Sequence, residues 1–245
     1  PPLARRCLGA LCREAIDGGG SVLVFCPSRA GTESAARELA ELFRGEGFDP
    51  AALLSASQQR HQAQERMDIQ ARLQGPQQQQ RPAPPPAQQG QLAQLVEQGL
   101  AYHHAGLSME QREAVEDAFR GGVVRVLFAT STLAAGVNLP ARRVVFRGLR
   151  VGMEPLDLTR YQQMAGRAGR LGLDILGESF ILLESATSPR AQEEWALAAA
   201  LLQRRRCGDA GNTAAADGDA NDAPSTSSPP RLRSCLAAQG GLWMQ

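Results

Sequence analysis

The chain has 245 residues, enough for one domain with additional segments, and 43% of them are hydrophobic, which permits a buried core. The formal net charge is only +1, so contact with nucleic acid has to come from local basic patches and not from the field of the whole chain. All 26 residues of the Lys and Arg class are arginine, which excludes a Walker A phosphate loop and every mechanism that needs a lysine.

The first predicted elements are a strand over residues 22–26 and a helix over 30–44. The strand is a short apolar run after a glycine-rich turn, which is typical of a buried strand in a parallel sheet. The helix carries leucine and alanine at helical spacing and ends at two glycines. A strand followed by a helix is the start of an α/β repeat.

Two segments have compositions that favour disorder. The segment from about 55 to 91 is rich in Gln, Pro and Ala, and the one from about 204 to 230 is rich in Gly, Asp, Ala, Ser and Pro. Neither can bury enough apolar surface to offset the entropy lost on ordering. We therefore predict one domain over 1–203 with a disordered insertion at 55–91, a disordered segment at 204–230, and the start of a following domain at 231–245.

Strands and helices alternate in the rest of the chain. Ser108 opens a capping box at the start of a helix that ends near Phe119. The other predicted helices are 92–98, 156–168 and 189–203, and the predicted strands are 101–103, 123–129, 143–147 and 178–184. This order predicts an α/β fold, a parallel sheet with helices on both faces.

The octapeptide QMAGRAGR at residues 163–170 is the most informative part of the chain. Arg167 and Arg170 are three residues apart, so on a helix their guanidinium groups lie on one face. The small glycines let a ligand or another surface approach the backbone, and Gln163 adds an amide. Because arginine forks bind phosphate oxygens in pairs, the cluster suits a triphosphate. A solvated arginine face at a helix end would explain the same residues.

Two further segments follow predicted strands, and ligands of open parallel sheets bind beyond the carboxyl ends of strands. Ser28 and Arg29 supply a hydroxyl and a guanidinium that can hold a phosphate, although Ser28 can also be an ordinary helix cap. Residues 130–138 supply three hydroxyls and backbone N–H groups at a predicted helix start, which is typical of an anion site. Capping and turn chemistry explain the second segment equally well.

Metal, disulfide and membrane functions have little support. The side chains of His103 and His104 diverge and have no third ligand at suitable spacing, so we expect packing or hydrogen bonding and no metal. The five cysteines form no C-x-x-C pair and are odd in number, which indicates a reduced, intracellular protein. No apolar run approaches the length of a membrane span. The start at Pro1, without methionine, suggests a piece of a longer protein.

Taken together and in order, these segments resemble the second RecA-like lobe of a superfamily 2 DExH helicase. Residues 22–29 resemble motif IV of that family, 102–107 motif IVa, 130–140 motif V and 163–170 motif VI. The words FCPS, GVNLPARR, PLD and GES, and RSCL after the second low-complexity segment, most resemble the branch with the helicase region of DNA polymerase theta, then HELQ. The likeness extends over roughly 8–203 without the insertion. It implies a RecA-like fold of the P-loop NTPase type that lacks its own P-loop.

The resemblance also implies roles for particular residues. ATP would lie in a cleft between this lobe and a first lobe. The first lobe is missing here and would supply most of the contacts to Mg²⁺. The residues facing the transferred phosphate would be Arg167, Arg170 and Gln163, and those near the nucleotide Gly136, Asn138 and Gly166. The residues that hold the backbone of a single strand would be Ser28, Arg29, Thr130 and Thr132.

The function implied by this branch is an ATP-dependent DNA helicase of double-strand break repair in the nucleus. Its partners would be single-stranded or forked DNA, the first lobe and downstream helicase domains of the same chain, and no membrane. An RNA helicase of a sister branch is one alternative, and a module that binds nucleic acid or a partner without turnover is another. The chain alone is expected to be inactive, because its partner lobe is absent.

Overall fold

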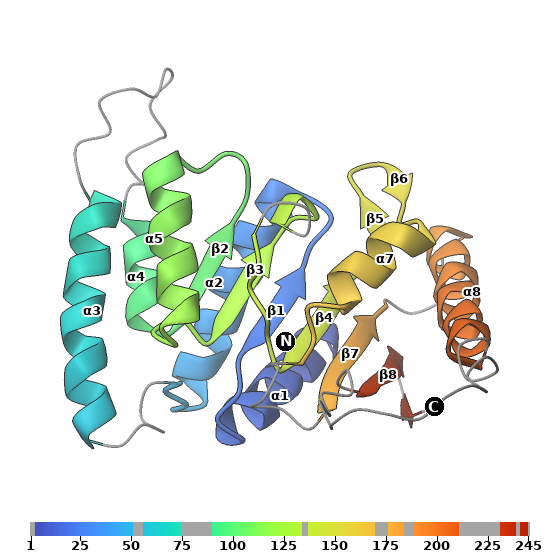
Figure 1. Ribbon diagram of the computed structural model, residues 1–245, viewed down its shortest axis with the longest axis horizontal. Helices are drawn as coiled ribbons and strands as arrows, with labels where there is room; N and C mark the ends of the chain where they lie inside the picture. The colour runs from blue at the N-terminus through green and yellow to red at the C-terminus, as the bar shows by residue number, and fades with distance from the viewer. Residues whose placement is uncertain are drawn as a thin grey trace, which may run out of the picture.

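The computed structural model describes most of the chain, and its element order is that of an α/β protein (Figure 1). The described residues are 3–50, 56–74, 90–133, 137–169, 176–183, 189–210, 231–238 and 241–244. The helices are α1 (Leu3–Asp17), α2 (Arg29–Gly45), α3 (Ala56–Gln74), α4 (Gln91–Glu97), α5 (Met109–Arg120), α7 (Leu158–Ala165) and α8 (Pro189–Ala210). The strands are β1 (Val22–Phe25), β2 (Leu100–His103), β3 (Val126–Ala129), β4 (Arg143–Arg147), β5 (Arg150–Val151), β6 (Glu154–Pro155), β7 (Leu176–Leu182), β8 (Arg231–Ala238) and β9 (Gly241–Met244).

A parallel sheet forms the centre of the structure. Its order is β2-β3-β1-β4-β7, and every neighbouring pair in this series is parallel. All residues of β1, β2 and β3 are buried, which explains their nearly continuous apolar sequences. The predicted α/β fold with a parallel sheet is confirmed.

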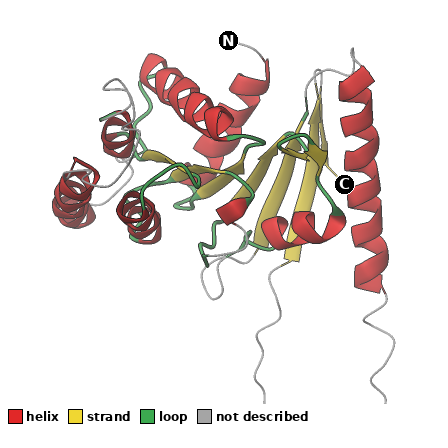
Figure 2. Ribbon diagram, turned by 90° about the horizontal axis from the view of Figure 1, so that it is seen from above, coloured by secondary structure: helices red, strands yellow, loops and turns green. Residues whose placement is uncertain are grey.

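Helices cover both faces of the sheet, as predicted (Figure 2). On one face, Arg147 of β4 pairs with Glu38 of α2 at 3.2 Å. On the other face, the ring of Phe146 lies 5.0 Å from the ring of Tyr161 in α7, measured between centroids. Successive strand residues point to opposite faces, so α2 and α7 lie on opposite sides of β4.

The structure differs from the prediction at the Gln-rich insertion. Its composition predicts disorder, yet Ala56–Gln74 form the helix α3, which lies beside α4 and α5 (Figure 1). Ile69 and Leu73, one turn apart, are buried, and Arg72 pairs with Asp117 of α5 at 2.9 Å. Gln, Ala, Glu, Arg and Met form helices readily, so a small buried face is enough to order them here. Residues 75–89 lie outside the described residues.

Two other features were not predicted, the helix α1 and the end of the helix α8. The helix α1 has Leu8, Leu11, Cys12 and Ala15 buried at helical spacing, a pattern that the sequence contains. The helix α8 continues to Ala210, beyond the predicted end at 203.

The C-terminal end of the chain adds strands to the sheet. β8 pairs with β7 in parallel and β9 pairs with β8 in antiparallel orientation. That a further domain begins at 231 stays a prediction, as do the other domain boundaries. None of the helices in the described ranges is long and apolar enough to cross a membrane.

Candidate functional site

The carboxyl ends of three neighbouring strands bring separate segments of the chain to one edge of the sheet. Phe25 of β1 is paired in register with Ala129 of β3, which is paired with His103 of β2. The residues that follow these strand ends therefore lie together. We call this group the strand-end cluster; it contains Ser28, Arg29, His104, Gly106, Thr130 and Thr132.

Ser28 begins the helix α2. Its hydroxyl oxygen accepts a hydrogen bond from the backbone N–H of Gly31 at 3.1 Å, so the helix-cap interpretation is correct. The cap leaves the hydroxyl hydrogen available to donate to an anion. Arg29 follows on the exposed surface. The first turn of α2 thus presents a hydroxyl and a guanidinium at the edge of the sheet.

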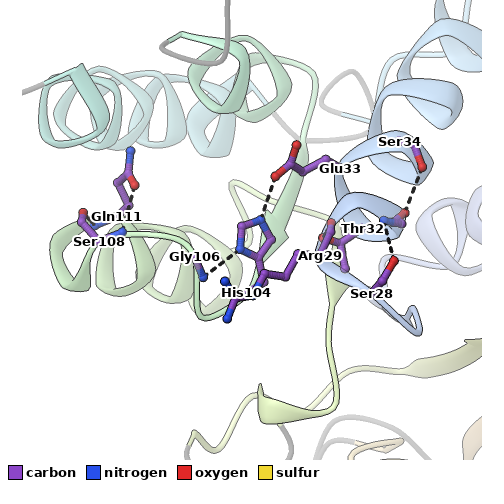
Figure 3. A network of polar contacts seen from close by, with 10 residues as sticks. Ser28, Arg29, Thr32, Glu33, Ser34, His104, Gly106, Ser108 and Gln111 are labelled. Atoms are coloured by element: carbon purple, nitrogen blue, oxygen red, sulfur yellow. Dashed lines mark hydrogen bonds and ion pairs between the residues drawn. The ribbon is translucent and has the colours of Figure 1, made fainter. Parts of the chain in front are cut away.

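His104 joins this helix to the loop after β2 (Figure 3). Its Nδ1 accepts the backbone N–H of Gly106 at 3.1 Å, and its Nε2 lies 3.1 Å from a carboxylate oxygen of Glu33 in α2. Because Nδ1 accepts, the proton is on Nε2 and is donated to Glu33. The ring is buried and stacks on Tyr102 with centroids 5.4 Å apart. Hydrogen bonding, the expected role, is what the structure gives this residue.

His103 is equally buried but faces another helix. Its Nε2 lies 2.9 Å from a carboxylate oxygen of Glu116 in α5. Each histidine is therefore paired with a single carboxylate, and the two carboxylates belong to different helices, α5 for His103 and α2 for His104. Over the described ranges, no three His, Cys, Asp or Glu residues lie close enough to hold a metal ion.

Burial lowers the pKa of both His103 and His104 below the ordinary value of 6.5, and this outweighs the neighbouring Glu116 and Glu33 carboxylates. At a pH well above 6.5 both rings are neutral in the folded and the unfolded chain. Below it the unfolded chain takes up protons first, so the free energy of unfolding should fall as the pH decreases from about 6.5.

Thermal unfolding at pH 7.5 and 5.5 checks this expectation. The melting temperature should drop at the lower pH, and the drop should be smaller in the double variant His103→Gln/His104→Gln. A wild-type chain that becomes more stable on acidification in this range would contradict it.

Thr130 and Thr132 follow the end of β3. Their hydroxyl oxygens are 2.9 Å apart, and the N–H of Thr130 donates to the carbonyl of His103. One hydrogen bond between two hydroxyls leaves one hydroxyl hydrogen for an outside acceptor. Thr132 is exposed.

The octapeptide region is only partly helical, which corrects the prediction that its arginines share a helix face. α7 ends at Ala165 with Gly166 as its C-cap. Ala168 then forms a parallel β-bridge with Ala141. The carbonyl of Arg167 accepts the Ala141 N–H at 2.9 Å, and the Gly169 N–H donates to the Ala141 carbonyl at 2.7 Å. Arg167 therefore lies in a turn. Arg170 lies outside the described residues.

Two glycines allow the shape of this turn, one within it and one on the neighbouring strand β7. Gly169 has a φ of 94°, a conformation that residues with a Cβ rarely adopt. The close approach of another segment occurs at Gly177 of β7, where a Cβ would lie 2.5 Å from the carbonyl carbon of Ala168. This contact is permitted by a glycine outside the octapeptide; that the octapeptide's own glycines let a ligand approach the backbone stays a prediction.

Arg167 contacts the segment after β3. Its Nη1 donates to the carbonyl of Val137 and lies 3.3 Å from Oδ1 of Asn138. Partial burial lowers the pKa of its guanidinium, which nevertheless stays charged. Asn138, Gln163 and Gly166 are exposed. We call Asn138, Gln163, Gly166 and Arg167 the arginine cluster; Gly136 lies outside the described residues.

The two clusters are joined by residues 130–139. Leu133 and Leu139 of this segment are buried, and with Leu23 and Phe25 of β1 they line a narrow hollow beside Arg167. Sequence reasoning proposed Ser28, Arg29, Thr130 and Thr132 as site residues, which the structure places at one edge of the sheet, but it assigned no site role to His104 or Gly106. It also missed Glu33, whose 71-residue separation from His104 gives no local signal.

Comparison with known proteins gives one family. Residues 88–172 match the helicase conserved C-terminal domain. The chain is 41% identical over 183 residues to DNA polymerase theta of Mus musculus, a match that covers 72% of this chain and 7% of that protein. It is 38% identical over 181 residues to ATP-dependent DNA helicase Hel308 of Pyrobaculum calidifontis, covering 72% and 23%. It is 41% identical over 163 residues to Helicase POLQ-like of Drosophila melanogaster, covering 66% and 14%. The chain thus spans at most 23% of these relatives.

Proposed function

Because the chain contains the second RecA-like lobe of a superfamily 2 helicase, in the group of DNA polymerase theta, Hel308 and the POLQ-like helicases, we propose that it forms half of the motor of an ATP-dependent DNA helicase. The observation that carries the proposal is the arginine cluster. Arg167 is fixed against Val137 and Asn138 at the end of α7, so its position does not depend on a ligand. A preorganised cation is what the transfer of a phosphoryl group requires.

The arginine cluster would form one wall of an ATP site. Arg167 and Arg170 would face the γ-phosphate and stabilise the charge that develops on it, and Gln163 would contact the same group. Gly136, Asn138 and Gly166 would lie near the ribose and phosphates. By the same resemblance, Mg²⁺ would be held mainly by the first lobe.

The strand-end cluster would hold the backbone of a single DNA strand. Arg29 offers a charge, while Ser28 and the pair Thr130 and Thr132 offer hydroxyl hydrogens at the same edge. Contacts of this kind bind phosphates without reading bases, so binding should weaken as salt rises. By the same resemblance, the protein would act on single-stranded or forked DNA in double-strand break repair in the nucleus.

ATP hydrolysis by the full-length gene product tests the proposal. Phosphate release should be stimulated by single-stranded DNA, and less by single-stranded RNA. The 245-residue chain alone should give no turnover, because a chain without lysine cannot supply a Walker A loop. Equal stimulation by RNA would favour an RNA helicase, and absence of any stimulation would favour a binding module. Turnover by the chain alone would show that the site is not shared between lobes.

A further inference from the structure

We propose that His104 is a positioning residue for the binding of a single DNA strand. It holds the loop after β2 against α2 and so orients Arg29 toward a phosphate. This inference rests on the proposed function of the strand-end cluster. His104 itself is buried, so it would not touch the bound DNA strand. It acts through the two groups that its ring nitrogens bind.

One ring nitrogen shapes the loop. The Gly106 N–H donates to Nδ1, and the Leu107 N–H donates to the His104 carbonyl at 3.1 Å, so residues 104–107 form a closed turn. A Cβ on Gly106 would lie 3.0 Å from Nδ1 and 3.6 Å from Cδ of Arg29. The turn at Gly106 therefore lies close to both the imidazole and the stem of the Arg29 side chain. Loss of the acceptor at Nδ1 frees this turn.

The other ring nitrogen fixes the distance to α2. Nε2 donates to Glu33, which follows Arg29 by one helical turn and lies on the same side of α2 (Figure 3). Stacking on Tyr102 and burial hold the ring in one plane. Both ring nitrogens of His104 are thus hydrogen-bonded, one to the loop after β2 and one to α2. The loop and the first turn of α2 therefore move as one unit.

The arrangement needs a neutral imidazole. A proton on Nδ1 would remove the acceptor for Gly106 and would place a positive charge near Arg29 and His103, with Glu33 as the neighbouring carboxylate. His103 provides a natural comparison because it has the same burial and the same kind of partner, Glu116, but on α5. A substitution of His103 therefore shows the effect of losing a buried histidine while the turn at Gly106 beside Arg29 is kept.

Binding of a fluorescent oligo-dT to the full-length gene product, measured at several salt concentrations, tests the proposal. Arg29→Ala is the reference variant and should flatten the dependence of log K on log salt by about 0.7, the value for one phosphate contact on a single strand. His104→Gln keeps an amide near Glu33 but removes the acceptor at Nδ1. It should flatten the dependence by the same amount and weaken binding about tenfold. The double variant should bind no more weakly than Arg29→Ala.

Glu33→Ala separates positioning from simple electrostatics. Removal of a carboxylate near the strand should by charge alone strengthen binding to DNA. If Glu33 acts through His104, its loss should weaken binding and flatten the salt dependence instead. His103→Gln should lower the melting temperature without changing the salt dependence.

The outcomes distinguish this proposal from the one on which it rests. If Arg29→Ala leaves binding unchanged, the strand site is wrong and the role of His104 is wrong with it. If Arg29→Ala weakens binding but His104→Gln keeps the wild-type salt dependence, only the positioning role is overturned. Additive effects of Arg29→Ala and His104→Gln, or a flattened dependence in His103→Gln, would overturn it as well.

Discussion

Replacing Arg170 by alanine in the full-length protein should abolish ATP hydrolysis while single-strand binding stays largely intact. Arginines that face a transferred phosphoryl group contribute about 10³ to 10⁵ in rate, because they stabilise charge that develops only as the bond breaks. The strand-end cluster lies at the carboxyl ends of β1, β2 and β3 and does not include the octapeptide. Steady-state phosphate release and oligo-dT binding by the same preparation measure the two effects.

Arg167→Ala should act on both properties. Its guanidinium also holds the carbonyl of Val137 and the side chain of Asn138, in the segment that leads back to Thr132. We expect a loss of hydrolysis as large as for Arg170→Ala, together with weaker strand binding. The difference between the two variants reports the coupling between the clusters.

Arg160→Ala is the matched control for both arginine variants. Arg160 lies on α7, is about half exposed, and pairs with Glu154 and Asp157, neither of which belongs to the arginine cluster. Its removal should leave hydrolysis and strand binding within a factor of about two, since exposed ion pairs contribute little. Loss of strand binding in Arg170→Ala would instead make that arginine a strand contact.

Much of the fold can be predicted from the sequence because its local signals agree with its packing. The apolar run at 22–26 is a buried strand, and the capping box at Ser108 has both of its hydrogen bonds. Alternation of strands and helices then predicts a parallel sheet. Each of these features depends on residues that are close together in the chain.

The features that the sequence did not predict depend on distant partners. The helix α3 is ordered because Ile69 and Leu73 are buried beside α5, which average composition cannot reveal. The pairing of His104 with Glu33 crosses 71 residues. The octapeptide looks helical throughout, but the bridge to Ala141 ends the helix before Arg167. In each case a tertiary contact decides the outcome.

The buried Arg143 is a further example, and it leads to the largest stability effect that we expect. Its side chain is 2% exposed at the start of β4, where a strand pattern predicts an apolar or solvent-facing residue. Its Nη1 donates to the carbonyl of Leu11 at 2.6 Å, its Nε donates to Glu178 at 2.9 Å, and the guanidinium lies 4.7 Å from the Phe180 ring centroid. The residue thus connects α1, β4 and β7.

Arg143→Ala should lower the free energy of unfolding by about 3 to 5 kcal/mol, because it leaves the partly buried Glu178 without its cation and opens a cavity beside Phe180. Urea denaturation measures the change as a lower midpoint at constant slope. Arg120→Ala is the control: Arg120 is 55% exposed and pairs with Asp117 in solvent, so its loss should cost less than about 1 kcal/mol.

A second substitution identifies the cause of the loss. In Arg143→Met/Glu178→Gln, no partly buried charge is left unpaired, because the remaining partner of Arg143, Glu14, is 72% exposed. The methionine also fills part of the volume, so the double variant should be more stable than Arg143→Ala. Arg143→Lys should fall between the wild type and Arg143→Ala, since an ammonium cannot reach Leu11 and Glu178 in the geometry of the fork. If the double variant is no more stable than Arg143→Ala, neither the unpaired carboxylate nor the cavity accounts for the loss, and the missing hydrogen bond to Leu11 of α1 is left as its cause.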